Sequence, residues 1–358
     1  MEIFVLLIVS ILCIFSILNF FTARSIKHKP PLVEESVSIL IPMRNEALNA
    51  LAVVNSSLSQ SKLSNLKVMA LDDSSSDETG QILATISDKR FSALPGEELP
   101  SGWLGKNFAL HCLASNTNSE YLVFIDADVR LESEAVAASI DLMNQLGWDY
   151  ISPYPRQVAH GALARMVQPL LQWSWFATLP LRLVENSRLA STVVANGQFF
   201  IVRNKAYRHS GGHEAVKGEV LDDLELARSL RRHGSRGSVV DASHISSCEM
   251  YRNSAELVAG YSKSQWRAFG GTLGAIFAVA LLFTSSVLPA LMMIKLEPWA
   301  IASYIALVLS RVLAALRTRS VIATAPLHPI AIFIWIVLIL RSLTLKRMGK
   351  LQWRGRSI

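Results

Sequence analysis

Long apolar stretches lie near both ends of the chain, and shorter patterns of apolar and polar residues fill the sequence between them. The first stretch, Ile3 to Phe21, has 19 residues, close to the roughly 20 that cross the hydrocarbon core of a bilayer. Positive charge follows it at Arg24, Lys27 and Lys29. A cleaved signal peptide carries its positive charge before the apolar run. Residues 1–29 are therefore predicted to be an uncleaved anchor whose C-terminal side lies in the cytoplasm.

Residues 269–340 contain three further apolar stretches, Phe269–Ile294, Trp299–Leu316 and Val321–Leu340. Four full crossings would place the basic tail, residues 341–358, outside the cell, against the positive-inside tendency. The last stretch also has two prolines near its start, and proline interrupts helical hydrogen bonding. A re-entrant or interfacial course is the alternative for this stretch, so the sequence leaves the number of crossings open.

Residues 35–250 are predicted to form one α/β domain between the apolar ends. Short runs rich in β-branched and apolar residues at 37–42, 66–71 and 121–125 predict strands, and each run leads into a polar loop and a helical pattern. Repeated strand, loop and helix units predict a mostly parallel sheet. Since ligands bind beyond the carboxyl ends of the strands in such sheets, the polar loops are where we expect the chemistry.

The composition separates this chain from an ordinary water-soluble protein. Hydrophobic residues make up 51% of it and charged residues 18%, whereas soluble domains carry about 25% charged residues. The net charge of +7 is compatible with an anionic membrane surface or a phosphate-bearing substrate, and we expect no nucleic-acid partner. The 3 cysteines are widely scattered, which excludes a disulfide scaffold and a zinc ribbon.

Two acidic pairs follow predicted strands. Asp126 and Asp128 come directly after the third strand, and an extended chain points residues two apart to the same side. They can hold Mg²⁺ or Mn²⁺ together with substrate phosphates, although a helix cap explains these residues equally well. Asp72 and Asp73 follow the second strand, where they can accept hydrogen bonds from a nucleobase and a ribose or belong to a helix cap.

Three later segments also carry candidate chemistry. Lys106 enters a predicted helix from a glycine-bracketed loop; because a lysine at a helix start opposes the helix dipole, a bound phosphate would resolve the conflict. Asp222 and Asp223 open an amphipathic helix and are candidates for a general base, with a favourable interaction with the helix dipole as the alternative. The loop with His213 and Glu214 is a candidate border of the acceptor site, although a plain turn explains its glycines.

Tryptophans mark candidate sites for an apolar acceptor. Residues 166–184 contain Trp173 and Trp175 between two prolines. This segment predicts either a helix buried against the sheet or an interfacial element at an acceptor entrance, since tryptophan prefers the headgroup region. Residues 253–268, which include Trp266, predict an amphipathic helix on the membrane surface.

Taken in order, these segments resemble the membrane-bound members of glycosyltransferase family 2, which have the GT-A fold. The resemblance covers about residues 37–266, nearly the whole block between the apolar ends. The matching stretches are VSILIPMRNE, LDDSSSDET, GWLGKNFAL, FIDADV, ANGQFFIVR, GGHEAVKGEVLDDLELA and MYRNSAELVAGYSKSQW. This family resemblance implies a cytoplasmic GT-A domain with a Rossmann-like, mostly parallel sheet, which lies in the sequence between N-terminal and C-terminal transmembrane helices.

The resemblance implies a nucleotide-sugar site in the loops after the first two strands. Carried over by position, Pro42, Arg44 and Glu46 border the nucleoside. Asp72 and Asp73 bind uracil and ribose. The donor implied in this way is a nucleoside diphosphate sugar, with UDP-glucose as our expectation.

It also implies roles for the remaining charged residues. Lys106 approaches the diphosphate, Asp126 with Asp128 holds Mg²⁺ or Mn²⁺, and Asp126 also belongs to the donor site. The Glu-Asp motif of the family falls on Asp222 and Asp223, so Asp223 is the base and the first position is conservatively changed. One departure is the Gln-x-x-Arg-Trp motif of polymer-forming relatives, for which Gln-Trp-Arg at 265–267 is the nearest text. This departure argues against polymer synthesis.

The implied function is inverting transfer of a hexose to a lipid at the cell (inner) membrane, by a multi-pass protein. Bacterial enzymes that glycosylate isoprenoid lipids, the diaponeurosporenoate and hopanoid-associated glycosyltransferases, are similar, so a carotenoid-type or hopanoid-type acceptor is expected. Two alternatives stay open. A nucleotidyltransferase shares the metal carboxylates but usually has a glycine-rich signature at the first strand, which VSILIPMRNE lacks. A non-catalytic membrane scaffold predicts loss of the acidic residues, which this chain keeps.

Overall fold

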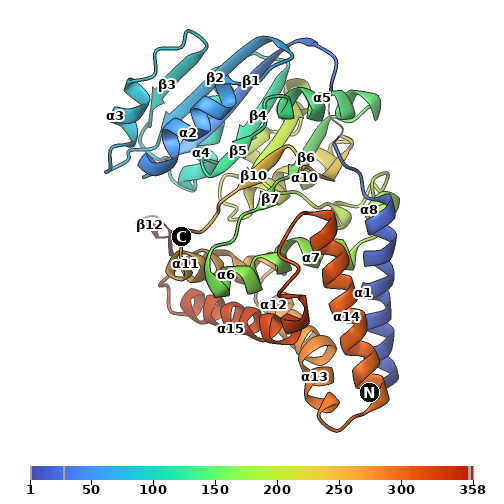
Figure 1. Ribbon diagram of the computed structural model, residues 1–358. Helices are drawn as coiled ribbons and strands as arrows, with labels where there is room; N and C mark the ends of the chain where they lie inside the picture. The colour runs from blue at the N-terminus through green and yellow to red at the C-terminus, as the bar shows by residue number, and fades with distance from the viewer. Residues whose placement is uncertain (1, 27–28, 354–355, 358) are drawn as a thin grey trace. The chain divides into compact units, whose positions relative to one another are not determined.

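The protein, described by a computed structural model over residues 2–26, 29–353 and 356–357, folds into two compact units. The membrane-helix unit comprises Met1–Ala23, Gln157–Leu183 and Glu249–Ile358, and the sheet unit comprises Arg24–Arg156 and Val184–Cys248. Each unit is therefore assembled from segments that lie far apart in the sequence. Figure 1 colours these segments along the chain.

A seven-stranded sheet with the order β3-β2-β1-β4-β8-β6-β9 forms the centre of the sheet unit. Its strands are β1 (Val33–Met43), β2 (Leu63–Asp72), β3 (Phe91–Pro95), β4 (Tyr121–Ile125), β6 (Tyr150–Tyr154), β8 (Phe199–Arg203) and β9 (Gly237–Asp241). Three shorter strands are β5 (Val129–Leu131), β7 (Arg156–Gln157) and β10 (Ser246–Cys248). β10 pairs antiparallel with β5.

Most neighbouring strands of the large sheet run parallel, as the alternation of strand and helix patterns predicts. β1 pairs parallel with β2 and β4, β2 pairs parallel with β3, and β6 pairs parallel with β9. The predicted strands at 37–42, 66–71 and 121–125 lie within β1, β2 and β4, so the α/β prediction is confirmed. β8, inserted antiparallel between β4 and β6, is the strand that the simple βαβ pattern does not predict.

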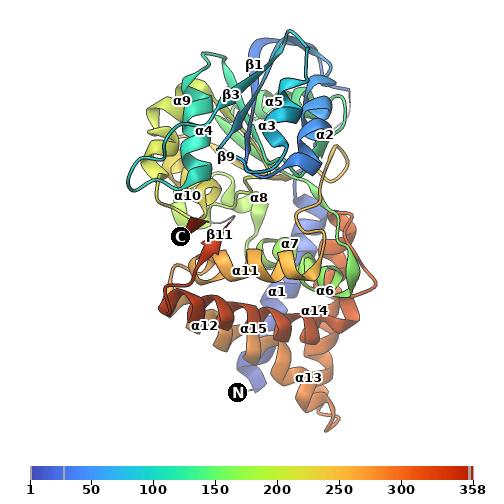
Figure 2. The same cartoon turned by 90° about the vertical axis from the view of Figure 1, so that its left-hand side faces the viewer.

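Helices cover both faces of this sheet (Figure 2). On one face lie α2 (Ala47–Leu58), α3 (Thr79–Ala84) and α5 (Ala135–Gln145); on the other lie α4 (Gly105–Ser115), α9 (Asn204–His209) and α10 (Asp222–Arg232). Two short 3-10 helices, η1 (Ala190–Thr192) and η2 (Gly212–Val216), also belong to this unit. The α4 and α10 face is sealed by fully buried side chains such as Leu113, Phe200 and Leu230. This packing fixes the starts of α4 and α10 relative to the strands.

The strand register brings the chemistry to one edge of the sheet. Met43 at the end of β1 pairs with Asp72 at the end of β2, which pairs in turn with Pro95 at the end of β3. The antiparallel β8 enters the sheet at the same edge, because Phe199 pairs with Ile125 at the end of β4. The loops after β1, β2 and β4 and the loop before β8 therefore open together.

The membrane-helix unit contains four helical stretches that are long and apolar enough to cross a membrane: Glu2–Thr22, Thr272–Met293, Pro298–Arg317 and Ala325–Arg347. They correspond to α1 (Glu2–Thr22), then α12 (Thr272–Leu282) joined to α13 (Leu288–Met293) through the π-helical turn η3 (Phe283–Val287), then α14 (Pro298–Arg317), then η4 (Ala325–Leu327) with α15 (His328–Arg347). The remaining elements are α6 (Gly161–Val167), α7 (Pro169–Thr178), α8 (Leu181–Val184), α11 (Ser254–Ala268), β11 (Gln352–Trp353) and β12 (Arg356–Ser357).

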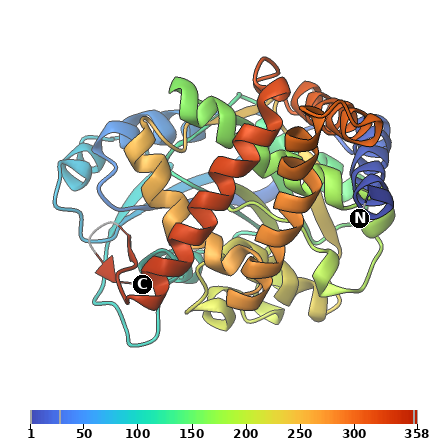
Figure 3. The same ribbon diagram turned by 90° about the horizontal axis from the view of Figure 1, so that it is seen from below.

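The last apolar helix, α15, does not run along α1 and α14. α1 and α14 pack side by side, whereas α15 lies along α11 and runs across the direction of α14 (Figures 1 and 3). Polar contacts join α15 to α11: Trp335 Nε1 donates to Gln265 Oε1 over 2.8 Å, and Ser342 Oγ donates to the Ser262 carbonyl over 2.6 Å. Whether α15 spans the bilayer or lies at its surface stays a prediction.

The segment with Trp173 and Trp175 belongs to the membrane-helix unit rather than to the sheet unit. The sequence assigned residues 35–250 to a single domain, but Gln157–Leu183 groups with the apolar helices. Its contacts show why: Asn19 of α1 donates to the carbonyls of Phe176 and Leu179, both over 2.7 Å. These contacts place α7 against α1 within the membrane-helix unit, and an interfacial role for the segment stays a prediction.

Candidate active site

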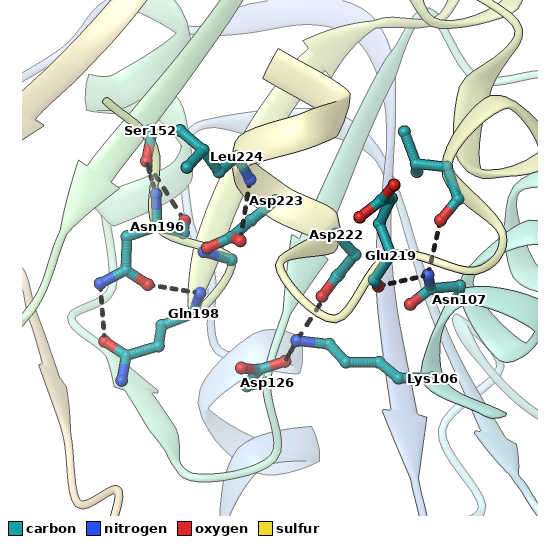
Figure 4. Close-up of polar contacts among 12 residues, drawn as sticks. Lys106, Asn107, Asp126, Ser152, Asn196, Gln198, Glu219, Asp222, Asp223 and Leu224 are labelled. Carbon is teal, nitrogen blue, oxygen red and sulfur yellow. Dashed lines mark hydrogen bonds and ion pairs between the residues drawn. The ribbon is translucent and has the colours of Figure 1, made fainter. Parts of the chain in front are cut away.

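Lys106 and two carboxylates form the charged centre of the sheet edge (Figure 4). Lys106 stands in the first turn of α4, with its Nζ 2.7 Å from Asp126 Oδ1 and 3.9 Å from Asp222 Oδ2. Burial alone would lower the pKa of Lys106, but the carboxylates of Asp126, Asp222 and Asp223 outweigh it and raise that pKa above its ordinary value. The lysine is therefore a permanent cation. It lies where the start of α4, the end of β4 and the start of α10 converge.

Asp223, in the first turn of α10, is fixed by main-chain donors. The Gly197 N–H donates to Asp223 Oδ2 over 2.6 Å, and the Leu224 N–H donates to Oδ1 over 2.8 Å. A Cβ on Gly197 would lie 2.9 Å from the Asp223 Cβ, so only glycine allows this approach. Burial, together with the neighbouring charge of Asp222, raises the pKa of Asp223 to about 6. A carboxylate with such a pKa is suited to accept a proton near neutral pH.

The loop before β8 completes the support of Asp223. Asn196 N–H donates to Ser152 Oγ over 2.8 Å, and Gln198 N–H donates to Asn196 Oδ1 over 2.8 Å. These contacts set the backbone of Gly197 and so the donor that Asp223 uses. The stretch ANGQFFIVR belongs to the family resemblance, but the resemblance implies no role for its individual residues. The signal was a glycine flanked by two amides directly before a strand.

Asn107 is a second supporting residue that the sequence analysis did not single out. It is 1% exposed, and its Nδ2 donates to the carbonyls of Val216, Lys217 and Glu219 over 2.8, 3.2 and 3.0 Å. One side-chain amide thus ties the start of α4, which carries Lys106, to the loop that leads into Asp222 and Asp223. Figure 4 shows this amide beside the charged centre.

Replacing Asn107 by aspartate should therefore lower kcat/KM about 10- to 100-fold, because misplacing a catalytic group by about 1 Å costs up to about 100-fold. The new carboxylate has no N–H to donate and repels the three carbonyls. Asn116→Asp is the matched control, since Asn116 ends the same helix and its Nδ2 donates only to the Cys112 carbonyl, over 2.9 Å. Initial rates and thermal midpoints of both variants check this. Equal rate losses in the two would show that Asn107 does not position the site.

One carboxylate oxygen of Asp128 indicates where a metal ion could bind. Its Oδ1 is buried without a hydrogen-bond partner. Burial and the charges of Asp126 and Glu46 raise the pKa of Asp128 to about 7. An orphaned carboxylate oxygen beside a second carboxylate fits a hard divalent cation completed by substrate phosphates. Within the described residues no cluster of three or more His, Cys, Asp and Glu side chains is arranged for a metal, so the protein alone supplies two carboxylates.

The residues predicted to border the nucleoside lie in the loops after β1 and β2. Arg44 Nη1 donates to the Asp73 carbonyl over 2.7 Å and lies 3.7 Å from Asp73 Oδ2. Asp72 Oδ1 accepts from the Ser75 N–H over 3.1 Å. Glu46 donates its main-chain N–H to Thr79 Oγ1 over 2.8 Å, just beyond Pro42 at the end of β1. The structure therefore brings these five residues together on adjacent strand ends.

The predicted acceptor residues are scattered. His213 is 2% exposed and forms a 2.9 Å hydrogen bond between its Nδ1 and the Tyr207 hydroxyl, while Glu214 beside it is exposed. Trp173 is buried in the membrane-helix unit, and the ring of Trp266 in α11 lies under Lys346 Nζ at 3.6 Å from its centroid. Burial and the hydrogen bond with Tyr207 fit a packing role for His213.

Comparison with known proteins agrees with this reading. The mannosyltransferase PcManGT from Pyrobaculum calidifontis, solved in complex with GDP-Man and Mn²⁺, aligns over 98% of this chain and 100% of its own with a TM-score of 0.55 and 13% identity. A 4,4'-diaponeurosporenoate glycosyltransferase from Staphylococcus haemolyticus is 26% identical over 205 residues, which are 55% of this chain. The match spans about half, 52%, of that relative's length.

The mostly parallel sheet with its antiparallel insertion is the GT-A-type fold that this mannosyltransferase also has. More particularly, residues 38–211 match the family model described as Glycosyl transferase family 2, and this match together with the curated relative supports a glycosyltransferase. The family resemblance deduced from the sequence motifs is thereby confirmed. Since the matched residues include β1 to β8, they cover the donor-side loops, Lys106 and Asp126, and end just before Asp222.

Proposed function

We propose that this glycosyltransferase moves a hexose, with inversion, from a nucleoside diphosphate sugar to a lipid acceptor at the cytoplasmic face of a bacterial inner membrane. UDP-glucose is the proposed donor. The observation that carries the proposal is the cluster in which Lys106 Nζ lies 2.7 Å from Asp126 Oδ1 and 3.9 Å from Asp222 Oδ2, beside the buried Asp223. A cation among carboxylates at a parallel-sheet edge suits a substrate that carries both phosphate and metal charge.

The donor is proposed to lie across the ends of β1, β2 and β4. Asp72 and Asp73 would accept hydrogen bonds from the base and the ribose, with Arg44 holding the loop of Asp73 in place. Asp126 and Asp128 would hold Mg²⁺ or Mn²⁺, as the orphaned Asp128 Oδ1 suggests. When bound, that cation neutralises charge on the leaving diphosphate. Lys106 adds a second positive charge on the same side.

Asp223 is proposed as the general base. It would take the proton of an acceptor hydroxyl while that oxygen bonds to the sugar carbon and the bond from this carbon to the diphosphate breaks. Main-chain donors hold both Asp223 oxygens, so the carboxylate is oriented before the acceptor arrives. An acceptor carboxylate would need no deprotonation, and Asp223 would then only orient it. Displacement in line from the opposite side inverts the sugar carbon.

A lipid acceptor is supported by the membrane-helix unit and by the relative named for diaponeurosporenoate. An anchor alone needs one crossing helix, but the described residues contain four helices that are long and apolar enough to cross a membrane. α11, with Trp266, and the α6–α7 segment, with Trp173 and Trp175, are proposed to meet the headgroup region, where tryptophan is favoured. The acceptor is proposed to be of the carotenoid or hopanoid type.

Transfer from labelled UDP-glucose into the lipid fraction tests the proposed function. Membranes that contain the protein should move label into an organic extract in the presence of Mn²⁺, and mass spectrometry should find one lipid heavier by a hexose. Membranes from cells that lack the gene serve as the control. Label that appears only in water-soluble polymer, or on no lipid with any nucleotide sugar, would contradict the proposal.

The pH profile gives an independent prediction. Because the base must be deprotonated and burial raises the pKa of Asp223 to about 6, kcat/KM for a hydroxyl acceptor should rise with pH and reach half of its plateau near pH 6. Below that pH the carboxyl is protonated and cannot accept the hydroxyl proton. Initial rates from about one pH unit below this midpoint to about two units above it check this. A profile that is flat through pH 6 would exclude Asp223 as the titrating base.

A further inference from the structure

The membrane-helix unit contains a buried arginine whose partners carry no charge. Arg311 of α14 is 0% exposed. Its Nη2 donates to the Met166 carbonyl over 2.6 Å and to Thr324 Oγ1 over 3.2 Å. Both acceptors are neutral, and its Nε and Nη1 are buried without a hydrogen-bond partner. A guanidinium inside an apolar helix bundle is costly unless an anion compensates it.

His328 and Trp173 stand beside this arginine. The Trp173 ring meets the His328 ring edge-on with 4.6 Å between centroids, and Trp173 Nε1 donates to Oγ of Ser310, the neighbour of Arg311, over 2.9 Å. His328 is 0% exposed, and neither of its ring nitrogens has a hydrogen-bond partner. The unused donors of two buried side chains therefore occupy one region of the unit.

Two helix starts converge on the same region. α15 begins at His328, and α7 begins at Pro169 directly after Gln168, which is 0% exposed with both amide atoms unpartnered. Thr324 links the two breaks, because its Oγ1 donates to the Arg165 carbonyl over 2.9 Å while it accepts from Arg311. The N-terminal end of a helix is its positive end, so the start of α15 adds to the positive potential of Arg311. At Gln168 the start of α7 meets the C-terminal, negative end of α6, whose Met166 carbonyl accepts from Arg311.

We propose that Arg311, His328 and Gln168 form a binding site for the oxyanion of an acidic lipid, either a carboxylate or a phosphate head group. The planar guanidinium has two donors free for such a group, which it can bind in a fork. Broken helices with unused polar groups at membrane depth persist where they meet a ligand or a cavity. Because Arg311 is fully buried, binding requires a local movement of the covering side chains.

Lipid binding to the purified full-length protein in detergent tests this proposal without any sugar donor, so its outcome does not depend on the proposed function. The probes are oleate, oleyl alcohol and dioleoyl phosphatidic acid, and the readout is lipid retained on the protein in native mass spectrometry. Oleate should bind at least 10-fold more tightly than oleyl alcohol. Arg311→Met should lose this preference, and Arg311→Lys, which keeps the charge without the fork, should retain part of it.

Arg317→Met is the matched control, because Arg317 ends the same helix and its Nη2 donates to the Ala23 carbonyl. This variant should bind oleate like the wild type. Displacement of oleate by phosphatidic acid would assign the site to bilayer phospholipid, and resistance to displacement would assign it to a lipid carboxylate. Thermal midpoints show that the variants fold. Equal oleate binding by the wild type and Arg311→Met, or equal binding of oleate and oleyl alcohol, would overturn the proposal.

Discussion

Asp223→Asn should lower kcat for sugar transfer to a hydroxyl acceptor about 1000-fold, while the affinity for the nucleotide sugar stays within about 3-fold, since general base catalysis contributes about 10²- to 10⁴-fold. In the wild type, the Gly197 N–H and the Leu224 N–H each donate to one oxygen of Asp223. The asparagine keeps one oxygen and can therefore keep one of these two hydrogen bonds. What it loses is the ability to take a proton. Single-turnover rates with labelled donor, and donor affinity by calorimetry, check the two halves of this prediction.

Glu225→Gln provides the matched control for Asp223→Asn. Glu225 lies in the same first turn of α10, but its carboxylate pairs with Arg228 at 2.6 Å rather than with the charged centre. This variant should keep at least about half of the wild-type rate, because it loses only a partly exposed ion pair worth at most about 1 kcal/mol. Equal losses in both variants would mean that the charge of the helix start matters rather than the base, and full activity of Asp223→Asn would remove the proposed role.

The sheet could be predicted because its strands carry their own signals. The runs at 37–42, 66–71 and 121–125 are apolar and end in polar loops, and they are the β1, β2 and β4 of the structure. The antiparallel β8 could not be predicted in the same way, because its place between β4 and β6 is set by pairing with residues far away in the sequence. Periodicity reports which face a residue takes, not which strand it meets.

The membership of the α6–α7 segment shows a similar limit. Its tryptophans and prolines are compatible with either unit, and the decision comes from contacts such as Asn19 with the Phe176 and Leu179 carbonyls. These residues are separated by more than 150 positions, so no local pattern could show them. The contact between Arg311 and the Met166 carbonyl could not be predicted for the same reason, because the two residues are 145 positions apart.

The charged residues of the site could be predicted, but their supports could not. Lys106, Asp126, Asp222 and Asp223 stand out as charges at strand ends and helix starts, and the structure brings them together. The Asn107 side chain acts on three main-chain carbonyls, and Gly197 acts through its own N–H. Main-chain groups are present at every position, so an asparagine or a glycine between amides indicates a turn as readily as a support for the site. Positioning residues of this kind appear only when the atoms they hold are known.

Neutralising Asp128 should have the other large effect. Asp128→Asn should lower the rate at a fixed low Mn²⁺ concentration about 100- to 1000-fold, because a metal supplies several kcal/mol of transition-state stabilisation and each 1.4 kcal/mol is tenfold. Within the described residues the buried Oδ1 of Asp128 has no hydrogen-bond partner. The neutral amide relieves the repulsion from Asp126 and Glu46 and keeps one oxygen for the Cys248 thiol, so the thermal midpoint should stay nearly unchanged. A defect in metal binding, unlike a defect in folding, should be partly relieved by raising Mn²⁺.

Two readouts separate these outcomes. Free Mn²⁺ is measured by electron paramagnetic resonance with donor present, and Asp128→Asn should bind the ion more weakly than the wild type. Asp141→Asn is the control and should bind Mn²⁺ like the wild type. Asp141 lies on α5, where its carboxylate accepts from Gln145 Nε2 over 2.8 Å. Chelator should abolish wild-type transfer, and Mn²⁺ should restore it. Full wild-type activity in chelator would show that Lys106 alone balances the diphosphate, and the carboxylates of Asp126 and Asp128 would then serve to place that lysine.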